Sequence, residues 1–194
     1  MVEDRDVVKE KIISAAAKIF SKYGFFKAPV HMIAREAGVS KGLVFWYFRT
    51  KHELIMEVAK RSLPLDVIDS CRQRGLSGRN LLECIGRAYM GKYKDPEQRN
   101  LLFHTMSLES QSKELAEYIR RLCEEKMVSV AEKVFGKCST EAKVAIRTFF
   151  GGLLCYTLRP PRDIDEQTFL EILIEMVWGG SIQSHASRFK SPRT

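Results

Sequence analysis

The stretch MIAREAGVSKGLVFWYFRTKHEL, residues 32–54, decides the fold of the chain. It holds two short apolar segments separated by Gly38, a residue that reaches the positive φ of a tight turn without a Cβ clash. Ser40 stands where a hydroxyl caps the next helix, and Ala34 is small enough for that helix to approach closely. This order of residues is typical of a helix-turn-helix whose second helix runs from Lys41 to Phe48.

The second of these short helices is rich in aromatic residues that do not share one face. At about 100° per residue, Val44 and Phe48 lie on one side, whereas Phe45 and Trp46 lie mostly elsewhere. We therefore expect Val44 and Phe48 to pack inward and the remaining aromatic residues to be available for contact.

The rest of the sequence also predicts helices, because apolar residues recur at helical spacing and alternating strand-like runs are scarce. A Thr-x-x-Glu capping box at residues 50–53 begins a fourth helix, which Pro64 should kink or divide because proline has no amide donor. Glycine pairs at 151–152 and 179–180 are expected to permit close helix crossings. Further helices are expected over residues 6–22, 80–92, 96–109, 112–135, 140–158 and 165–183, so the predicted class is all-α with about nine helices.

Composition favours a polyanionic partner, because 32 Lys and Arg residues against 24 Asp and Glu residues give a net charge of +8. Five cysteines, at positions 71, 84, 123, 138 and 155, include no C-x-x-C pair and are predicted to be free structural thiols in a reducing cytoplasm. The charged start MVEDRDVVKEK and the lack of a long apolar run predict a cytoplasmic chain without a membrane partner.

No catalytic constellation is visible. The histidines at 31, 52, 104 and 185 are dispersed and form no metal-binding motif. The segment GRAYMGKY, residues 86–93, nearly matches a phosphate loop, but Tyr93 occupies the position whose Ser or Thr hydroxyl must reach magnesium. We therefore predict that the protein is not an enzyme and has no metal site and no cofactor.

The segment APVHMIAREAGVSKGLVFWYFRTKHEL, residues 28–54, resembles the pattern ATVRDIAREAGVSKGTLYHYFPSKEAL of TetR-type regulators, the TetR/AcrR family. The resemblance extends over roughly Ile12 to Leu54. It implies a homodimeric transcriptional regulator, most often a repressor, that binds a palindromic operator in double-stranded DNA. It also implies a helix-turn-helix DNA-binding domain over residues 1–52 and a larger helical ligand-binding and dimerisation domain over 53–186. Residues 187–194 are expected to form a flexible basic tail, because Arg188, Lys190 and Arg193 have no acidic residue near them in sequence.

The same resemblance implies a set of DNA contacts, with Lys41, Tyr47 and Lys51 at positions that usually touch DNA. Lys51 lies in the first turn of its helix, where its charge and the free amides beside it suit a phosphate. His31 is a further candidate contact, and the alternative is an ordinary exposed polar residue. The full predicted DNA-binding set is His31, Ser40, Lys41, Gly42, Leu43, Phe45, Trp46, Tyr47 and Lys51.

This chain departs from the family pattern in the second short helix. Leu43 replaces a frequent Thr, Phe45 a frequent Tyr and Trp46 a frequent His, so apolar surface takes the place of hydroxyl and imidazole contacts. Base reading is then expected to depend on thymine methyl groups and on fit. Pro29 replaces the usual capping residue and is expected to serve as the first helical residue.

The resemblance implies a cavity in the larger domain, and because such pockets are mostly apolar, the expected occupant is a hydrophobic small-molecule effector that releases the protein from DNA. A fatty acyl-coenzyme A is one candidate, with Arg87, Lys92, Arg99 and Arg120 or Arg121 at its head group, although solvated helix faces explain the same charges. The alternative function is a helical lipid- or drug-binding module that does not bind DNA. The predicted ligand-binding set is Tyr89, Tyr93, Phe103, Met106, Phe149, Phe150, Leu153 and Trp178.

Overall fold

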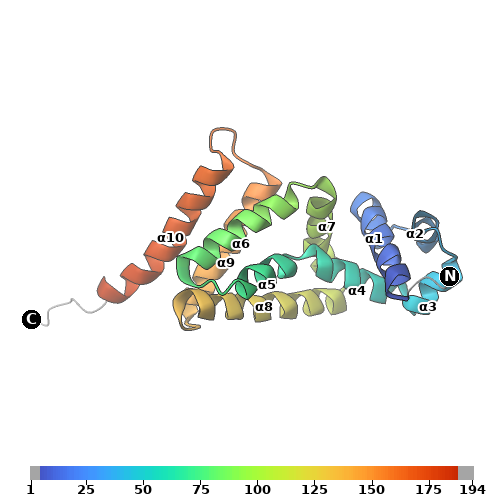
Figure 1. Ribbon diagram of the computed structural model, residues 1–194, viewed down its shortest axis with the longest axis horizontal. Coiled ribbons are helices and arrows are strands. Elements are labelled where there is room, and N and C mark those ends of the chain that lie inside the picture. Colours follow the sequence, from blue (N-terminus) through green and yellow to red (C-terminus); the bar gives the residue numbers. More distant parts are fainter. Residues whose placement is uncertain (1–4, 188–194) are drawn as a thin grey trace, which may run out of the picture. The chain divides into compact units, whose positions relative to one another are not determined.

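The computed structural model describes residues 5–187, and every regular element within that range is helical (Figure 1). Residues 188–194, which make up nearly all of the predicted basic tail, lie outside the described residues. The elements in order are α1 (Arg5–Tyr23), α2 (Val30–Ala37), α3 (Lys41–Tyr47), α4 (Lys51–Ser62), α5 (Leu65–Gln73), α6 (Gly78–Tyr93), α7 (Pro96–Met106), the 3₁₀ helix η1 (Ser107–Ser110), α8 (Lys113–Phe135), α9 (Thr140–Leu158) and α10 (Glu166–Ser187).

The predicted fourth helix is divided at Pro64, as its missing amide requires. Helix α4 ends at Ser62, and its C-cap residue Leu63 has extended dihedral angles of φ −72° and ψ 158°. Helix α5 then begins at Leu65. This division accounts for ten α-helices in residues 5–187 where the sequence predicted about nine.

The chain forms two compact units. The head unit is the described part of Met1–Pro64 together with Asp95–Arg120, and the body unit is Leu65–Lys94 together with the described part of Arg121–Thr194. Helix α7 and the first turns of α8 thus belong to the head unit, although they follow two helices of the body unit in sequence. The predicted division at residues 52 and 53 follows the sequence order of the helices and therefore did not anticipate this return.

The core of the head unit forms around α1, which packs against α2, α4 and α7. Ile12, Ala16 and Phe20 on α1 are fully buried, as its helical periodicity predicts. Burying a side chain as large as Phe20 contributes about 1.5–3 kcal/mol relative to leaving it exposed. Ile33 of α2 and Leu54 of α4 complete this core.

The core of the body unit forms around α6, which packs against α5, α9 and α10. Two glycines allow close approach. A Cβ on Gly86 would lie 2.3 Å from Leu170 Cδ1, and a Cβ on Gly152 would lie 2.8 Å from Leu173 Cδ1. Gly151 has no such neighbour within 4 Å, so the expected close crossing at the 151–152 pair is made by Gly152.

The prediction of five free thiols is wrong for two of them. Cys71 of α5 and Cys84 of α6 form a disulfide, because the packing of these two helices brings their Cα atoms to 5.9 Å, within bridging range. Cys123, Cys138 and Cys155 are free. The sequence separation of 13 residues matches no familiar cysteine motif, so only the tertiary arrangement reveals the pair.

None of the helices in residues 5–187 has the length and hydropathy needed to cross a bilayer. The same range contains no group of three or more His, Cys, Asp or Glu side chains arranged to hold a metal ion.

Candidate nucleic-acid interface

Helices α2 and α3 form the predicted helix-turn-helix. Gly38 ends α2 in the left-handed region at φ 67° and ψ 30°, and its amide donates to backbone carbonyls at the end of α2. Ser40 caps α3, because its hydroxyl accepts a hydrogen bond from the Leu43 amide at 3.1 Å. Both local predictions are confirmed. Pro29, expected as the first helical residue, is instead the N-cap of α2, with an extended ψ of 140°.

The two faces of α3 differ as the helical spacing predicts. Val44 and the C-cap residue Phe48 are buried in the head unit. Leu43, Phe45 and Trp46 are exposed, and Trp46 keeps 59% of its surface open to solvent. Three large apolar side chains on the exposed face of one short helix are unusual for a solvated element, so this face is suited to binding.

Cations and rings restrain these aromatic side chains. The Arg5 guanidinium lies 5.4 Å from the Trp46 ring centre, and the Lys41 ammonium lies 5.9 Å from that of Phe45. The Trp46 and Tyr47 rings meet edge to face at 4.8 Å. Arg5 lies far from α3 in sequence and was not predicted, because only packing of α1 brings it to Trp46.

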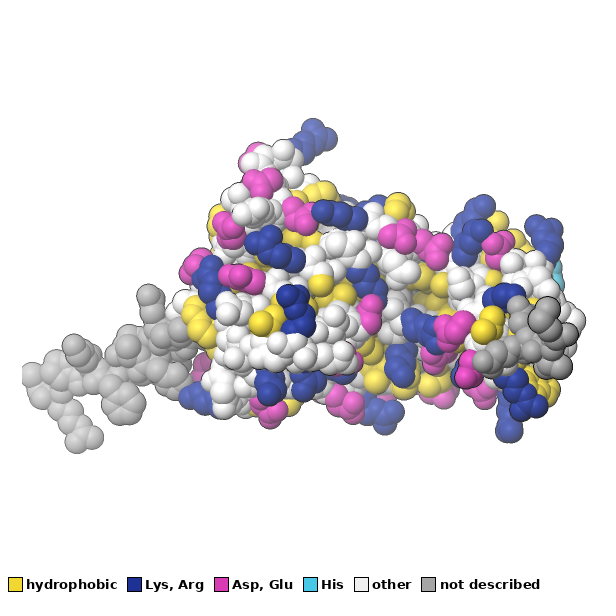
Figure 2. All heavy atoms as spheres, viewed as in Figure 1, with side chains coloured by type: hydrophobic (Ala, Val, Ile, Leu, Met, Phe, Trp, Pro, Cys, Tyr) yellow, Lys and Arg dark blue, Asp and Glu magenta, His cyan; other side chains and the backbone are white. Residues whose placement is uncertain are grey.

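Charged side chains cover the head unit. Figure 2 shows Lys and Arg side chains interspersed with Asp and Glu over the N-terminal helices, as over the other helices in this view. Lys41, Gly42 and His31 are exposed, and Tyr47 is half-buried. His31 lies on α2 rather than α3. All of the predicted DNA-binding residues therefore lie on α2, α3, the turn between them or the first turn of α4.

Lys51 makes a contact that the sequence did not predict. Its Nζ donates to the Phe26 carbonyl at 2.7 Å, which ties the first turn of α4 to the segment between α1 and α2. Partial burial lowers the pKa of Lys51. An ammonium group has three N–H donors, so one bond to Phe26 leaves donors for another acceptor.

The capping box at the start of α4 forms with one difference. The Glu53 amide donates to Thr50 Oγ1 at 3.1 Å, as predicted. The Glu53 carboxylate accepts from the Arg49 amide at 2.9 Å rather than from Thr50. These two bonds therefore fix Arg49, which lies two residues after the end of α3, and stabilise the junction between α3 and α4.

Two residues of α7, His104 and Thr105, contact other parts of the head unit. No pattern in the sequence connects them with DNA binding. The His104 ring packs edge to face on Phe25 at 6.3 Å, beside Gly24 in the turn after α1. The buried hydroxyls of Ser62 and Thr105 lie 2.7 Å apart and join α4 to α7. These contacts join α7 to the segment before α2 and to the end of α4, all within the head unit.

The predicted ligand-binding residues divide between the two units. Five form an aromatic and aliphatic cluster in the body unit, in which the Tyr89 ring lies 4.6 Å from Tyr93 and 6.4 Å from Phe150. Burial raises the pKa of both tyrosines. Phe103 and Met106 are exposed side chains of the head unit. The five clustered residues are Tyr89, Tyr93, Phe149, Phe150 and Leu153.

Trp178 of α10 lies apart from these aromatic contacts, because its ring stacks on Phe135 of α8 at 5.8 Å. It also lies 3.3 Å from where a Cβ on Gly78 would be. The predicted ligand set is therefore brought together only in part.

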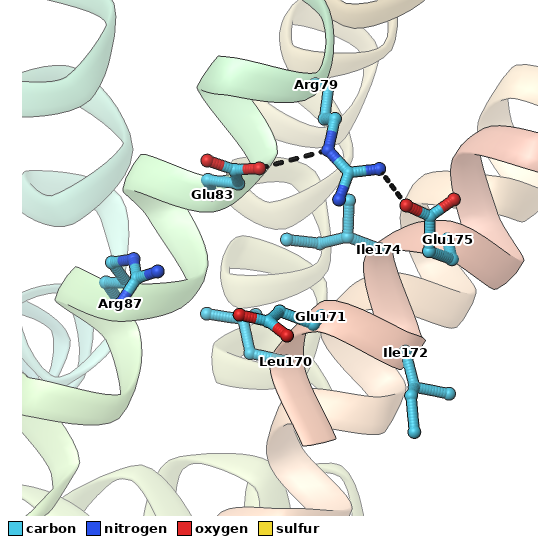
Figure 3. Close-up of a pocket in the computed structure, with 8 residues that line it drawn as sticks. All are labelled: Arg79, Glu83, Arg87, Leu170, Glu171, Ile172, Ile174 and Glu175. Carbon is cyan, nitrogen blue, oxygen red and sulfur yellow. Dashed lines mark hydrogen bonds and ion pairs between the residues drawn. The ribbon is translucent and has the colours of Figure 1, made fainter. Parts of the chain in front are cut away.

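An open groove of about 480 Å³ lies between α6 and α10 of the body unit (Figure 3). Arg79 bridges it by donating to Glu83 of α6 and to Glu175 of α10. Arg87 lines the same groove on α6. The near-match to a phosphate loop, residues 86–93, is part of the continuous helix α6 and forms no loop.

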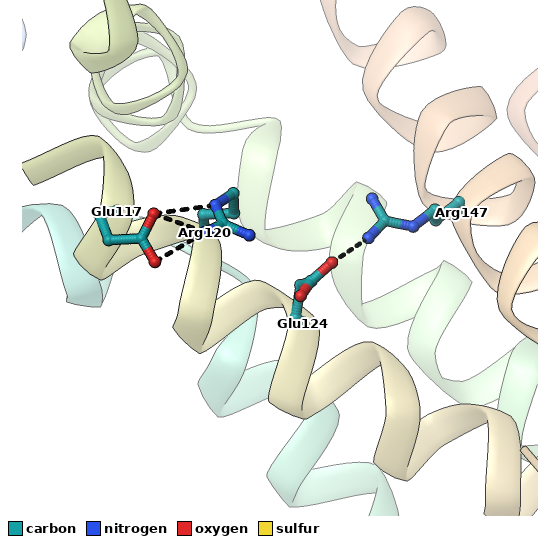
Figure 4. Close-up of polar contacts among 4 residues, drawn as sticks. All are labelled: Glu117, Arg120, Glu124 and Arg147. Atoms are coloured by element: carbon teal, nitrogen blue, oxygen red, sulfur yellow. Dashed lines mark hydrogen bonds and ion pairs between the residues drawn. The ribbon is translucent and has the colours of Figure 1, made fainter. Parts of the chain in front are cut away.

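Other predicted head-group cations are paired. Lys92 bonds Asp66 at 2.6 Å. Arg120 bonds Glu117 within the head-unit part of α8 (Figure 4). Figure 4 also shows a pair in the body unit that involves no predicted head-group residue, in which Arg147 bonds Glu124. Ion pairs thus account for two of the predicted head-group charges, those of Lys92 and Arg120.

Comparison with known proteins is consistent with this geometry. Residues 12–58 match the family described as bacterial regulatory proteins, tetR family. The HTH-type transcriptional regulator HbdR of Aromatoleum sp. (strain CIB) is 41% identical over 63 residues, which are 32% of this chain and 26% of that protein. The chain therefore spans about a quarter of the length of this curated relative.

Two solved structures share the fold over nearly the whole chain. A TetR-like transcriptional regulator from Rhodococcus sp. RHA1 has a TM-score of 0.70 and 18% identity, covering 91% of this chain and 96% of that one. The fatty acid degradation regulator FadR from Bacillus halodurans has a TM-score of 0.72 and 15% identity, covering 89% of this chain and 95% of that one. Residues 12–58 therefore match the tetR family of bacterial regulatory proteins, and the chain shares its all-helical fold with these two solved structures.

Proposed function

We propose that this protein is a homodimeric, ligand-responsive transcriptional repressor that reads a palindromic operator with α3. The observation that carries the proposal is the exposed apolar face of α3, held by the Ser40 cap and the Gly38 turn. Helix-turn-helix proteins place this second helix in the major groove with its N-terminal residues at base edges.

Sequence reading is assigned to Leu43, Phe45 and Trp46. Apolar side chains in the major groove recognise the C5-methyl group of thymine, which the other bases lack. The cation contacts from Arg5 and Lys41 reduce the freedom of the two rings before binding. We infer that the operator half-site contains thymines under α3.

Phosphate binding is assigned to Lys51, Tyr47, Lys41 and His31. Lys51 is fixed at the N-terminus of α4, where backbone amides and the helix dipole favour an anion. Contacts of this kind set the register of a protein on DNA and carry little sequence information.

The homodimer is assigned to α9 and α10. Val144 of α9 and Ile172 and Met176 of α10 are each more than half exposed, and Gly151 is open on the surface of α9. Such side chains are suited to a helix-to-helix interface. Two heads related by a twofold axis would place half-site centres about 34–36 Å apart.

The effector is proposed to be hydrophobic and to bind in the body unit near the Tyr89 cluster. The Bacillus halodurans neighbour is a fatty acid degradation regulator, which supports an acyl chain as the first ligand to test. Bound effector must weaken operator binding by the same free energy by which bound operator weakens effector binding, and such coupling is typically about 1–3 kcal/mol.

The deciding experiment is operator binding as a function of salt, with Lys51→Met compared with Lys133→Ala in the body unit. Log affinity should fall with log salt at about 0.9 per phosphate contact. Lys51→Met keeps most of the aliphatic stem and should weaken binding to all sequences, lowering the slope by about one contact per head. Lys133 is exposed, and its variant should bind like the parent protein.

Two results would contradict this assignment. A Lys51→Met protein with lower stability but the parental salt slope would limit Lys51 to its bond with Phe26. A parent protein whose affinity for DNA is weak and independent of salt would favour the alternative, a ligand-binding module that does not read DNA.

A further inference from the structure

The Cys71–Cys84 disulfide has no place in the proposed reading of DNA. It joins the last turns of α5 to the first half of α6 inside the body unit. Cys71 is only 2% exposed, whereas Cys84 is half-buried and therefore reachable from solvent. The two sulfur atoms thus differ in their exposure to solvent. This is the arrangement of a redox pair in which the exposed thiol is oxidised first and the buried thiol then attacks it to form the disulfide.

A cation lies beside the more accessible sulfur. Arg74, in the segment between α5 and α6, points its Nη1 at Cys84 Sγ from 3.4 Å. A neighbouring guanidinium stabilises a thiolate, and the thiolate is the form that attacks peroxides and disulfides. The reduced pair would therefore react through Cys84.

We propose that Cys71 and Cys84 form a redox-sensing site, whose disulfide opens with dithiols and closes with a peroxide, and whose state sets operator affinity. The last clause rests on the proposed function. A protein that binds bacterial DNA works where thiols are kept reduced, and disulfides in that compartment are mostly transient and sensing.

The chemistry of closure balances with hydrogen peroxide as the oxidant. The Cys84 thiolate attacks one peroxide oxygen, the O–O bond breaks, and hydroxide leaves as Cys84 becomes a sulfenic acid. Cys71 sulfur then attacks the Cys84 sulfur, the S–O bond breaks, and the departing hydroxide takes a proton to become water. The sum is two thiols and one peroxide giving one disulfide and two waters.

The disulfide adds a third attachment to a short helix. Asp66 of α5 bonds Lys92 of α6 at 2.6 Å, and Asp69 bonds Lys126 of α8 at 2.5 Å. The bridge at Cys71 holds the last turns of α5, beyond both ion pairs in sequence. Reduction would release that end. Helix α5 starts directly after Pro64, and α4 of the head unit ends two residues before Pro64, at Ser62. A change in the mobility of α5 therefore acts on the chain segment that leads into the head unit.

The test uses the full chain in graded buffers of reduced and oxidised glutathione, followed by denaturation, alkylation and mass measurement. Three alkylated cysteines are expected under oxidising conditions and five under reducing conditions, and micromolar hydrogen peroxide should return the count to three. Operator affinity should differ at least threefold between the two forms. Five reactive cysteines in every buffer, or three even in millimolar dithiothreitol, would overturn the proposal.

Variants separate sensing from folding. Cys71→Ser and Cys84→Ser should each abolish the redox change in affinity, whereas Cys155→Ser, which removes an exposed free thiol, should keep it. Arg74→Gln should slow closure by peroxide about three- to tenfold, and Arg74→Lys should restore most of the rate. Equal closure rates in both Arg74 variants and the parent would remove the role of that guanidinium.

The two proposals fail in different ways. A reversible change in thiol count without any salt-dependent DNA binding in either form would reject the proposed function. A thiol count that changes while operator affinity stays constant would reject the sensing role and leave DNA reading intact.

Discussion

Two glycines of α6 provide matched tests of the packing that shapes the body unit. A Cβ added at Gly86 would lie 2.3 Å from Leu170 Cδ1 and 3.1 Å from Cδ2, closer than carbon atoms pack. Leu170 is 3% exposed and has little room to move away. Gly91 lies five residues further along the same helix, is exposed, and has no such neighbour within 4 Å.

The two alanine variants should change stability in different directions. Replacing a helical glycine by alanine gains about 1 kcal/mol from backbone propensity, so Gly91→Ala should stabilise by up to about that amount. Gly86→Ala has the same gain, but overpacking of a tight core costs about 1–3 kcal/mol. Gly86→Ala should therefore leave the protein about 1–3 kcal/mol less stable than Gly91→Ala.

Urea unfolding followed by circular dichroism at 222 nm measures this difference. Protein concentration must be the same for both variants, since the stability of a proposed dimer depends on concentration. Equal slopes against urea would show that the variants expose the same surface on unfolding. In a Leu170→Ala background the clash is gone, so Gly86→Ala should become stabilising there. A Gly86→Ala protein as stable as Gly91→Ala would refute the close approach of α6 and α10.

Three further outcomes are expected. The Ser62 hydroxyl donates to the Ala59 carbonyl, so the hydroxyl of Thr105 is the donor in the bond between Thr105 and Ser62. Ser62→Ala should lower the free energy of unfolding by about 1–3 kcal/mol, because it leaves the buried Thr105 hydroxyl without this partner. Adding Thr105→Val should lower it little further, as measured by urea unfolding in a double-mutant cycle. The hydrogen bond from Arg61 lowers the pKa of Glu10, so this pair stabilises the fold above the unfolded pKa near 4.5 and ceases to do so as pH falls through the lower folded pKa. Because both side chains are largely exposed, Glu10→Gln should cost less than about 1 kcal/mol at pH 7 and nothing at pH 2–3, measured by thermal unfolding at each pH. Replacing operator thymines with uracil should weaken binding about fourfold per lost methyl contact, and the effect should shrink in Trp46→Ala; equal affinity for both DNAs would contradict apolar base reading.

Local features of the fold could be predicted because their causes are local. Gly38, Ser40 and Thr50 act through dihedral angles and hydrogen bonds within three or four residues, and the structure places each where the sequence indicated. The break at Pro64 follows from one missing amide. The inward and outward sides of α3 follow from helical geometry alone.

Features that depend on distant residues could not be predicted in this way. The approach of Arg5 to Trp46, the bond from Lys51 to Phe26 and the pairing of Cys71 with Cys84 each join different elements. The predicted ligand set is brought together only in part for the same reason, since the sequence does not show which of two units an aromatic residue at helical spacing will join. Phe103 was grouped with Tyr89 by sequence, whereas α7 folds into the head unit.

The return of α7 to the head unit limits how the body unit can communicate with α3. The chain passes between the units at only three places within the described residues: after Pro64, after Lys94 and after Arg120. The first two lie at breaks between helices, where backbone dihedral angles can change at low cost. The third lies inside the continuous helix α8, where a change would break helical hydrogen bonds. The proposed ligand and redox events in the body unit should therefore act on the head unit at the Pro64 junction, next to α5, and through α8, which moves as a rigid element. Ser62 and Thr105 then acquire a specific role, because their hydrogen bond keeps α4 and α7, which adjoin the Pro64 and Lys94 junctions, moving as one.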